Sequence, residues 1–188
     1  MLYLPGCAKK KINPCLNENN IVETIYEIRS NSTICFKTID SYDLDYTDSS
    51  ELTIFGHLTY PEHQKNSYDA IILSHGSGGI RRYHKKYVDL LNKHGYVVFQ
   101  IDHYTPRNIK YDKTFSKVSG VTFMNDSFRA LKLLKTHPLI DKIGYIGWSQ
   151  GGVGPILSHF KTVTSFINEK EVGLAINLFP ASVIFKRP

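Results

Sequence analysis

Apolar residues follow two alternating patterns over the second half of the chain. Short, nearly continuous apolar runs are typical of strands covered on both faces, and they occur at residues 70–73, 96–101, 143–146 and 174–179. Residues 83–94 and 121–134 instead place apolar side chains at three- and four-residue spacings, which predicts amphipathic helices. We expect a third helix at residues 150–161. Strands that alternate with helices predict an α/β fold, with a mostly parallel sheet and helices on both faces.

The first part of the chain follows a different pattern. Residues 33–37 and 51–58 are rich in β-branched and aromatic side chains, which suits half-buried antiparallel strands at the edge of a sheet. Residues 1–30 are rich in Asn and Lys, and we expect a loosely ordered N-terminal leader with one short helix near Ile21–Ile28. Residues 31–188 would then form the folded domain.

Length and charge narrow the classes of function. The chain has 188 residues, of which 41% are hydrophobic, enough for one domain with a core. Its 23 Lys and Arg against 17 Asp and Glu give a formal net charge of +6. These cations are spread along the chain without a nucleic-acid-binding module, so we interpret them as solvated surface charge and expect no nucleic-acid partner. No apolar run approaches the ~20 residues of a membrane-spanning helix.

The three cysteines, Cys7, Cys15 and Cys35, cannot close a complete set of disulfides. No C-x-x-C pair is present, and the histidines lack metal-ligand spacing, so we expect no metal site. The run Leu4-Pro5-Gly6-Cys7 loosely resembles the end of a lipoprotein signal, but the ~7–15-residue apolar stretch of such a signal does not precede it. We expect a cytoplasmic protein by default, and an exported one if the true start lies upstream of Cys7.

The motif that carries chemistry is Gly147-Trp148-Ser149-Gln150-Gly151, a G-x-S-x-G sequence. It stands between an apolar strand and a predicted helix, the context in which this motif forms a tight turn that presents a nucleophilic serine. Side chains at the two glycine positions would collide with neighbouring chain. We therefore predict that Ser149 is the nucleophile. The alternative is that the two glycines only mark a tight turn.

A second glycine-rich run, Ser74-His75-Gly76-Ser77-Gly78-Gly79, follows the first parallel strand. Acyl transfer requires hydrogen-bond donors for the developing oxyanion, and a loop at this position supplies one in hydrolases with the G-x-S-x-G motif. We predict that the backbone N–H groups of Ser77 and Gln150 face one spot beside the Ser149 oxygen, and that His75 hydrogen-bonds within its own loop. The competing interpretation is a phosphate cradle, but the chain lacks a G-x-x-x-x-G-K-[ST] sequence.

Five segments of the chain together resemble a known family. These segments are Ile71 to Gly79, Gly95-Tyr96-Val97-Val98, Asp102 with Pro106-Arg107, Asp126 with Ala130-Leu131, and Gly147 to Gly152. In this order, over about residues 51–180, they resemble the dienelactone hydrolase family of α/β-hydrolases. The resemblance implies hydrolysis of esters or lactones without a cofactor, by an incomplete α/β-hydrolase domain. The dienelactone hydrolases proper carry a cysteine as nucleophile, so Ser149 favours a general serine esterase. Serine peptidases of the same fold are equally similar, which leaves peptide bonds as an alternative.

The other members of a catalytic triad are missing from their expected places. In this fold an acid and then a histidine follow the serine, but no Asp follows Ser149 and the only later histidine is His159. If residues 150–161 are helical, His159 lies about 15 Å along the helix axis from Ser149. Glu169 and Glu171 precede the last predicted strand, whereas the triad acid follows a later one. Two further strand–helix units, about 60 residues, would be expected, and we place the acid and the base in sequence not present here.

Earlier residues provide one internal substitute and one candidate binding group. Asp102 and His103 end the second parallel strand, at the edge where sites gather in open α/β sheets, and could act as a dyad. Arg107 follows Pro106 in a loop over the strand ends. It could clamp a substrate carboxylate through two parallel hydrogen bonds, and a structural salt bridge is the alternative.

Two functions therefore remain open. One is a serine hydrolase that cleaves a small carboxylic ester or lactone through an acyl-enzyme on Ser149. The other is a catalytically incompetent remnant or binding module that keeps the pocket without the acid and histidine. A sheet that ends at the last predicted strand exposes an unpaired edge. Besides the small-molecule substrate, the expected partner is therefore an oligomer or a second chain that covers this edge.

Overall fold

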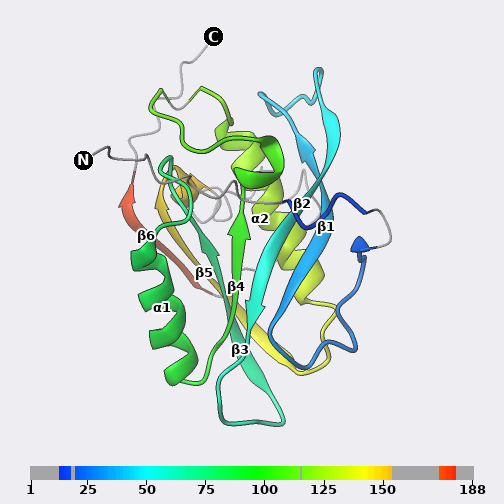
Figure 1. Ribbon diagram of the computed structural model, residues 1–188, viewed down its shortest axis with the longest axis vertical. Helices are drawn as coiled ribbons and strands as arrows, with labels where there is room; N and C mark the ends of the chain where they lie inside the picture. The colour runs from blue at the N-terminus through cyan, green and yellow to red at the C-terminus, as the bar shows by residue number, and fades with distance from the viewer. Residues whose placement is uncertain (1–12, 18–19, 115, 154–173, 181–188) are drawn as a thin grey trace, which may run out of the picture.

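Six strands form one mixed sheet in the order β1-β2-β4-β3-β5-β6 (Figure 1). The computed structural model describes residues 13–17, 20–114, 116–153 and 174–180. The strands are β1 (Ser32–Asp40), β2 (Ser50–Thr59), β3 (Tyr68–Ser74), β4 (Val97–Asp102), β5 (Ile140–Ser149) and β6 (Leu174–Pro180). The helices are α1 (Arg82–Lys93) and α2 (Gly120–Leu134), with short 3-10 turns η2 (Thr105–Arg107) and η3 (Gln150–Gly152).

The centre of the sheet is parallel, as predicted. Strand β3 pairs in parallel with β4 and with β5, and β5 pairs in parallel with β6. The pairs β1–β2 and β2–β4 are antiparallel. Of the two antiparallel strands predicted at the edge of the sheet, only β1 lies there, because β2 is inserted between β1 and β4. The predicted α/β class and mostly parallel sheet are confirmed.

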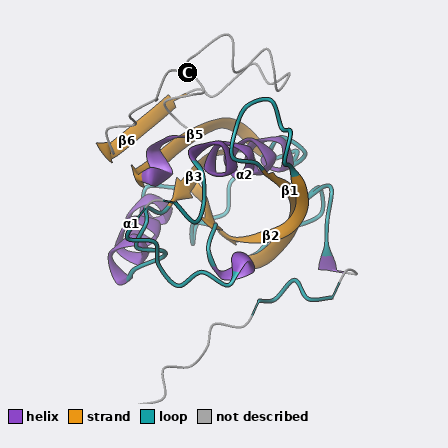
Figure 2. Ribbon diagram, turned by 90° about the horizontal axis from the view of Figure 1, so that it is seen from above, coloured by secondary structure: helices purple, strands orange, loops and turns teal. Residues whose placement is uncertain are grey.

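Each face of the parallel strands packs against one helix. Along β3, Ala70 and Ile72 join the core formed with α2, whereas Ile71 and Leu73 join the core formed with α1. This alternation follows from the two-residue period of a strand, and burial of each large aliphatic side chain contributes about 1.5–3 kcal/mol. The sheet curves around α2, and α1 lies on the opposite side (Figure 2). The helices therefore cover both faces, as the sequence predicted.

Local sequence sets the ends of the two helices. The N–H of Gly95 donates to the Asn92 carbonyl, and its φ of 87° is a left-handed conformation that glycine adopts without strain. Ser119 caps the start of α2 by accepting a hydrogen bond from the Thr122 N–H at 3.0 Å. Local sequence therefore sets where α1 ends before β4 and where α2 begins.

The described part of the leader is attached more firmly than expected. Cys15 forms a disulfide with Cys35 of β1, and Ile21 makes a parallel bridge to the same residue. Ile25 is 1% exposed in the core on the α2 face. The helix predicted near Ile21–Ile28 is wrong, because this segment pairs with β1 and buries Ile25 instead. The division of the chain into leader and domain stays a prediction.

The disulfide pairs two of the three cysteines. Cys7 lies outside the described residues. Counting cysteines could not identify this pair, because the contact depends on how the segment before β1 folds back. Cross-links of this kind persist mainly in oxidising compartments.

Two other elements differ from the sequence prediction. Strand β5 begins at Ile140, earlier than the apolar run at 143–146, because Ile140 pairs with Tyr68 of β3. Of the helix predicted at 150–161, residues Gln150–Gly152 form η3, and residues 154–161 lie outside the described residues. The last predicted strand is confirmed as β6. None of the described helices is long and apolar enough to cross a membrane.

Candidate active site

Ser149 ends β5 at a sharp turn into η3. Its backbone angles, φ 50° and ψ −118°, lie in a region that residues with a side chain rarely adopt, at a cost of about 1–3 kcal/mol. The register between β5 and β6 shifts between Trp148 and Ser149, so regular pairing stops here. Ser149 is partly exposed, whereas both of its neighbours are buried. The turn thus has the strained, accessible serine that the G-x-S-x-G motif predicts.

Both glycines of the motif are required by close backbone contacts. A Cβ on Gly147 would lie 2.2 Å from the carbonyl oxygen of Gly151. A Cβ on Gly151 would lie 2.5 Å from the carbonyl oxygens of both Ser74 and His75. Backbone atoms cannot rotate out of the way as side chains can, so only glycine fits at either position. The motif is therefore a consequence of how tightly the turn packs on the ends of β5 and β3.

The glycine-rich loop after β3 lies directly against Ser149. A Cβ on Gly76 would approach the Cβ of Ser149 to 3.1 Å. The loop turns at Gly79, whose N–H donates to the Gly76 carbonyl at 3.0 Å and whose φ is 71°. Ser77 is partly exposed between them, and its carbonyl accepts from the Asp112 N–H at 2.9 Å. Ser77 and Ser149 thus belong to adjoining turns at one edge of the sheet.

Gln150 is held through both ends of its side-chain amide. The Tyr104 hydroxyl donates to Gln150 Oε1 at 2.9 Å, and Gln150 Nε2 donates to the Val118 carbonyl at 2.6 Å. These bonds fix the residue that follows Ser149, and with it the neighbouring backbone. The sequence indicated Gln150 only through its backbone N–H. The anchoring Tyr104 was missed because nothing local links it to the motif.

His75 hydrogen-bonds within its own loop, as predicted. Its Nδ1 donates to the Gly76 carbonyl at 2.7 Å, and its Nε2 accepts from the His103 N–H at 3.1 Å. Burial, reinforced by the neighbouring His103, lowers the pKa of His75 to about 3. His75 is therefore a neutral structural group, and both of its ring nitrogens are already bonded.

The Asp102–His103 dyad does not form. Asp102 accepts from the N–H groups of Tyr104 and Thr105 at 3.1 and 2.9 Å, and from the Thr105 hydroxyl at 2.7 Å. The ring of His103 instead faces Asp126 of α2, with 2.7 Å between Nδ1 and Oδ2. Successive side chains at a strand end point to opposite faces, which separates these two residues despite their adjacency.

Arg107 is a structural residue, which contradicts its predicted role as a substrate clamp. Its Nε donates to Asp40 at 2.9 Å, and both terminal nitrogens donate to Asp126, at 2.9 and 3.0 Å. The remaining donors bind Asp40 and, at 2.7 Å, the His103 carbonyl. The side chain is 6% exposed. A guanidinium has five N–H donors, and all five are used here. The structural salt bridge is therefore the correct alternative.

Asp126 is the charged residue whose role the sequence did not reveal. It lies fully buried on the inner face of α2. Burial raises its pKa, but the charge of Arg107 and the hydrogen bond from His103 more than compensate and lower the pKa to about 2. The available signal was a carboxylate on the apolar stripe of a helix between Met124 and Phe128, which is costly unless the charge is paired.

A base for Ser149 is not found among the described residues, since none of them forms a hydrogen bond with its hydroxyl. His159, Glu169 and Glu171 lie outside the described residues. Within the described part of the chain, no group of three or more His, Cys, Asp or Glu residues is arranged to hold a metal ion.

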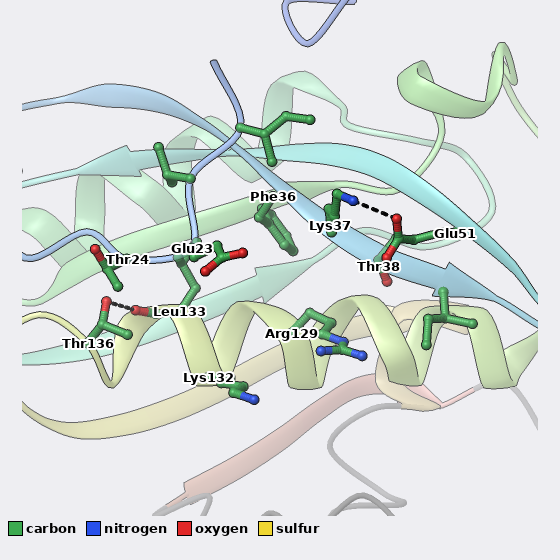
Figure 3. A pocket seen from close by; sticks show the side chains of 13 residues that line it. Glu23, Thr24, Phe36, Lys37, Thr38, Glu51, Arg129, Lys132, Leu133 and Thr136 are labelled. Carbon is green, nitrogen blue, oxygen red and sulfur yellow. Dashed lines mark hydrogen bonds and ion pairs between the residues drawn. The ribbon is translucent and has the colours of Figure 1, made fainter. Parts of the chain in front are cut away.

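A cavity of about 510 Å³ lies away from Ser149, between residues 21–24, β1 and α2. Figure 3 shows Arg129 and Lys132 on the α2 side of this cavity and the Lys37–Glu51 ion pair on the strand side. Its charged residues are exposed, and none of its lining residues belongs to the turn at Ser149 or to the loop after β3. We therefore do not assign it to the candidate active site.

The arrangement of sheet, turn and loop is shared with solved structures. No protein-family model matches the sequence, and no curated protein matches it significantly. Est1E from Butyrivibrio proteoclasticus with ferulic acid bound is 21% identical, with a TM-score of 0.57 over 76% of this chain and 53% of its own. The α/β hydrolase GrgF from Penicillium sp. sh18 is 18% identical, with a TM-score of 0.55 over 81% of this chain and 46% of its own.

The fold is that of an α/β-hydrolase. A hydrolase from Agrobacterium vitis S4, described as putative, has the same likeness, with a TM-score of 0.57, 14% identity, and coverage of 84% of this chain and 57% of its own. The chain thus spans about half the length of the structures that it matches. At these identities the likeness establishes the fold, which is consistent with a hydrolase, and the substrate is a matter for proposal.

Proposed function

We propose that the protein is a serine hydrolase of the dienelactone hydrolase type, which cleaves a small carboxylic ester or lactone through an acyl-enzyme on Ser149. The observation that carries the proposal is the strained, partly exposed turn at Ser149, enforced by Gly147 and Gly151. A buried hydroxyl on a relaxed strand would need no such turn. The solved structures of the same fold include Est1E with ferulic acid bound and the α/β hydrolase GrgF, which supports the proposal.

The reaction follows from these groups. The Ser149 oxygen attacks the ester carbonyl carbon while a general base takes its proton, and the carbonyl oxygen becomes an oxyanion. The backbone N–H groups of Ser77 and Gln150 would donate to that oxygen. Collapse of the intermediate breaks the bond to the leaving alcohol, which receives the proton. Water then attacks the acyl-enzyme, releases the acid and restores Ser149. No cofactor is needed for these steps.

The alternative function is a binding module without catalysis. It is favoured by one observation, that no base contacts Ser149 among the described residues. His75 and His103 lie beside the turn, buried and with both ring nitrogens bonded. His84 packs edge-on against the ring of Trp148, and its buried Nε2 has no partner among the described residues. Its Nδ1 accepts from the Arg81 N–H, and no hydrogen bond joins it to Ser149. A base would therefore come from outside the described residues, from further chain, or from a partner.

A fluorophosphonate probe separates the two functions. The probe reacts covalently with an activated serine, so we expect one labelled site in the wild type and no labelling in Ser149→Ala. The matched control is Ser67→Ala, which removes an exposed hydroxyl just before β3, at the end of the strand away from Ser149, and it should still be labelled. Absence of labelling in wild-type protein that unfolds cooperatively would support the binding module. Labelling that persists in Ser149→Ala would overturn the assignment of the nucleophile.

A further inference from the structure

A second serine at the same edge of the sheet has hydrogen-bond partners that Ser149 does not have among the described residues. Ser74 is the last residue of β3, and its Oγ lies 2.7 Å from His103 Nε2. His103 Nδ1 in turn lies 2.7 Å from Asp126 Oδ2. Because Nδ1 faces a carboxylate, it carries the ring proton, and Nε2 accepts from the Ser74 hydroxyl. These three residues, which we call the buried relay, have the serine–histidine–aspartate order of a catalytic triad.

The buried relay is inaccessible to a substrate. Ser74, His103 and Asp126 are each 0% exposed. Ser74 lies within a regular strand that pairs with β4 and β5 on its two sides, so its backbone is not turned outward as that of Ser149 is. A hydroxyl in this place cannot attack an ester, and the hydrogen bonds must serve another purpose.

At the Asp126 end, the buried relay is held by an ion pair and a further hydrogen bond. Arg107 donates to both oxygens of Asp126 and also to Asp40 at the end of β1. The Thr38 hydroxyl donates to Asp126 Oδ1 at 2.7 Å. A buried network in which every member has a partner is rigid, because breaking any bond leaves a polar group without water. The relay therefore connects Ser74 to β1 and α2.

At the Ser74 end, the buried relay contacts both the glycine-rich loop and the turn at Ser149. Ser74 directly precedes the loop of residues 75–79 that packs against Ser149. The Ser74 carbonyl is also one of the atoms that a Cβ on Gly151 would approach to 2.5 Å. In addition, the His103 N–H donates to His75 in that loop. A shift of Ser74 or His103 would therefore move the loop relative to the Ser149 turn.

We propose that the buried relay of Ser74, His103 and Asp126 is a positioning device that holds the loop of residues 75–79 at the correct distance from Ser149. The proposal rests on the proposed function, because the loop is assigned the oxyanion donor of Ser77. His103 and Ser74 are positioning residues that do not touch the substrate. Misplacement of catalytic groups by about 1 Å lowers rates up to ~100-fold, so a small displacement of the loop has a measurable effect.

The experiment compares Ser74→Ala and His103→Gln with wild type in full-length protein. The matched control is His57→Gln, which disrupts a hydroxyl–imidazole pair with Thr33 on the exposed face of β1 and β2. Fluorophosphonate labelling of Ser149 is measured over a range of probe concentrations, which separates the maximal rate from the half-saturating concentration. Amide hydrogen exchange of residues 76–79 is followed in the same samples. A low-field imidazole proton is sought in the wild-type proton NMR spectrum.

We expect Ser74→Ala and His103→Gln to lower the maximal labelling rate about 10- to 100-fold, with little change in the half-saturating concentration. A purely structural role would reduce the folded fraction without changing the rate within it. Exchange at residues 76–79 should accelerate in both variants and stay unchanged in His57→Gln. The low-field proton, held between His103 and Asp126, should be present in wild type and absent in His103→Gln.

Several results would overturn the proposal. One is a folded Ser74→Ala protein with unchanged exchange at residues 76–79, and another is a wild-type spectrum without the low-field proton. If Ser74→Ala does not fold, the labelling and exchange of His103→Gln and the low-field proton of the wild-type spectrum still test the proposal. If wild type is not labelled at all, the proposed function fails, whereas exchange and NMR continue to test whether the relay holds the loop.

Discussion

Ser74 and Ser149 stand at the ends of neighbouring strands and differ in almost every other respect. Ser74 is fully buried in a regular strand, and its hydroxyl bonds to a histidine that is paired with an aspartate. Ser149 is partly exposed on a strained turn, and no described residue bonds to its hydroxyl. Ser74 has the hydrogen-bond partners of a nucleophile but is closed to a substrate. Ser149 is accessible but has no such partners among the described residues.

This difference teaches that hydrogen-bond geometry alone does not identify a catalytic serine. A search for serine–histidine–aspartate distances would select Ser74, whereas backbone strain and exposure select Ser149. Strain is the more telling feature here, because a conformation that costs free energy persists only where surrounding contacts enforce it. At Ser149 those contacts are the glycine packing at 147 and 151.

The largest expected loss of stability comes from Gly147→Ala, which disrupts the turn at Ser149 and leaves the buried relay intact. The new Cβ would lie 2.2 Å from the Gly151 carbonyl oxygen, so the turn must rearrange. We expect the free energy of unfolding to fall by at least about 4 kcal/mol, and labelling of Ser149 to be lost. Chemical denaturation and fluorophosphonate labelling measure the two effects.

Gly78→Ala is the control for this substitution. Its Cβ would approach only the flexible side chain of Arg81, at 3.3 Å. The free energy of unfolding should change by less than about 1 kcal/mol. If Gly147→Ala were as mild as Gly78→Ala, the turn would not be enforced by packing, and the contrast between the two serines would lose its basis.

The second-largest loss of stability is expected from Asp126→Ala, which removes the carboxylate of the buried relay that contains Ser74. Removing this carboxylate leaves the buried guanidinium of Arg107 with only one of its two carboxylate partners, Asp40. Breaking a buried ion pair in this way costs about 3 kcal/mol or more. Asp89→Ala breaks the exposed Lys85–Asp89 pair instead, and should cost no more than about 0.5 kcal/mol. Equal losses in denaturation experiments would contradict the rigid anchor inferred behind the buried relay.

The smallest effect is expected from Tyr104→Phe, which loosens the residue after Ser149. Without the hydroxyl, Gln150 Oε1 loses its buried donor, at a cost of about 1 kcal/mol. Labelling of Ser149 should slow by a few-fold because Gln150 is less firmly held. Tyr42→Phe removes an exposed hydroxyl that bonds to the Ser116 carbonyl, and its labelling rate should match wild type. An unchanged rate in Tyr104→Phe would show that the side chain of Gln150 does not position its backbone.

The elements predicted from the sequence are those set by local patterns. The apolar runs of β3 and β4 and the stripe of α2 are encoded within a few neighbouring residues, and the structure has them near the predicted bounds. The G-x-S-x-G turn is local only in part, since Gly147 packs against Gly151 within the motif, whereas Gly151 packs against the distant chain at Ser74 and His75. Where a local pattern competed with a distant partner it failed, as at Ile21–Ile28, which pairs with β1 instead of forming a helix.

By itself, the sequence determined the α/β class, the strained turn at Ser149 and the glycine-rich loop that follows β3. Only the tertiary structure decided the partners of the charged and polar residues. It paired His103 with Asp126, enclosed Arg107 between two carboxylates and joined Cys15 to Cys35. The physical reason is that hydrophobic periodicity is repeated along a segment, whereas a buried hydrogen bond or ion pair is a single contact between residues far apart in the chain. Its existence depends on which faces the sheet and helices bring together.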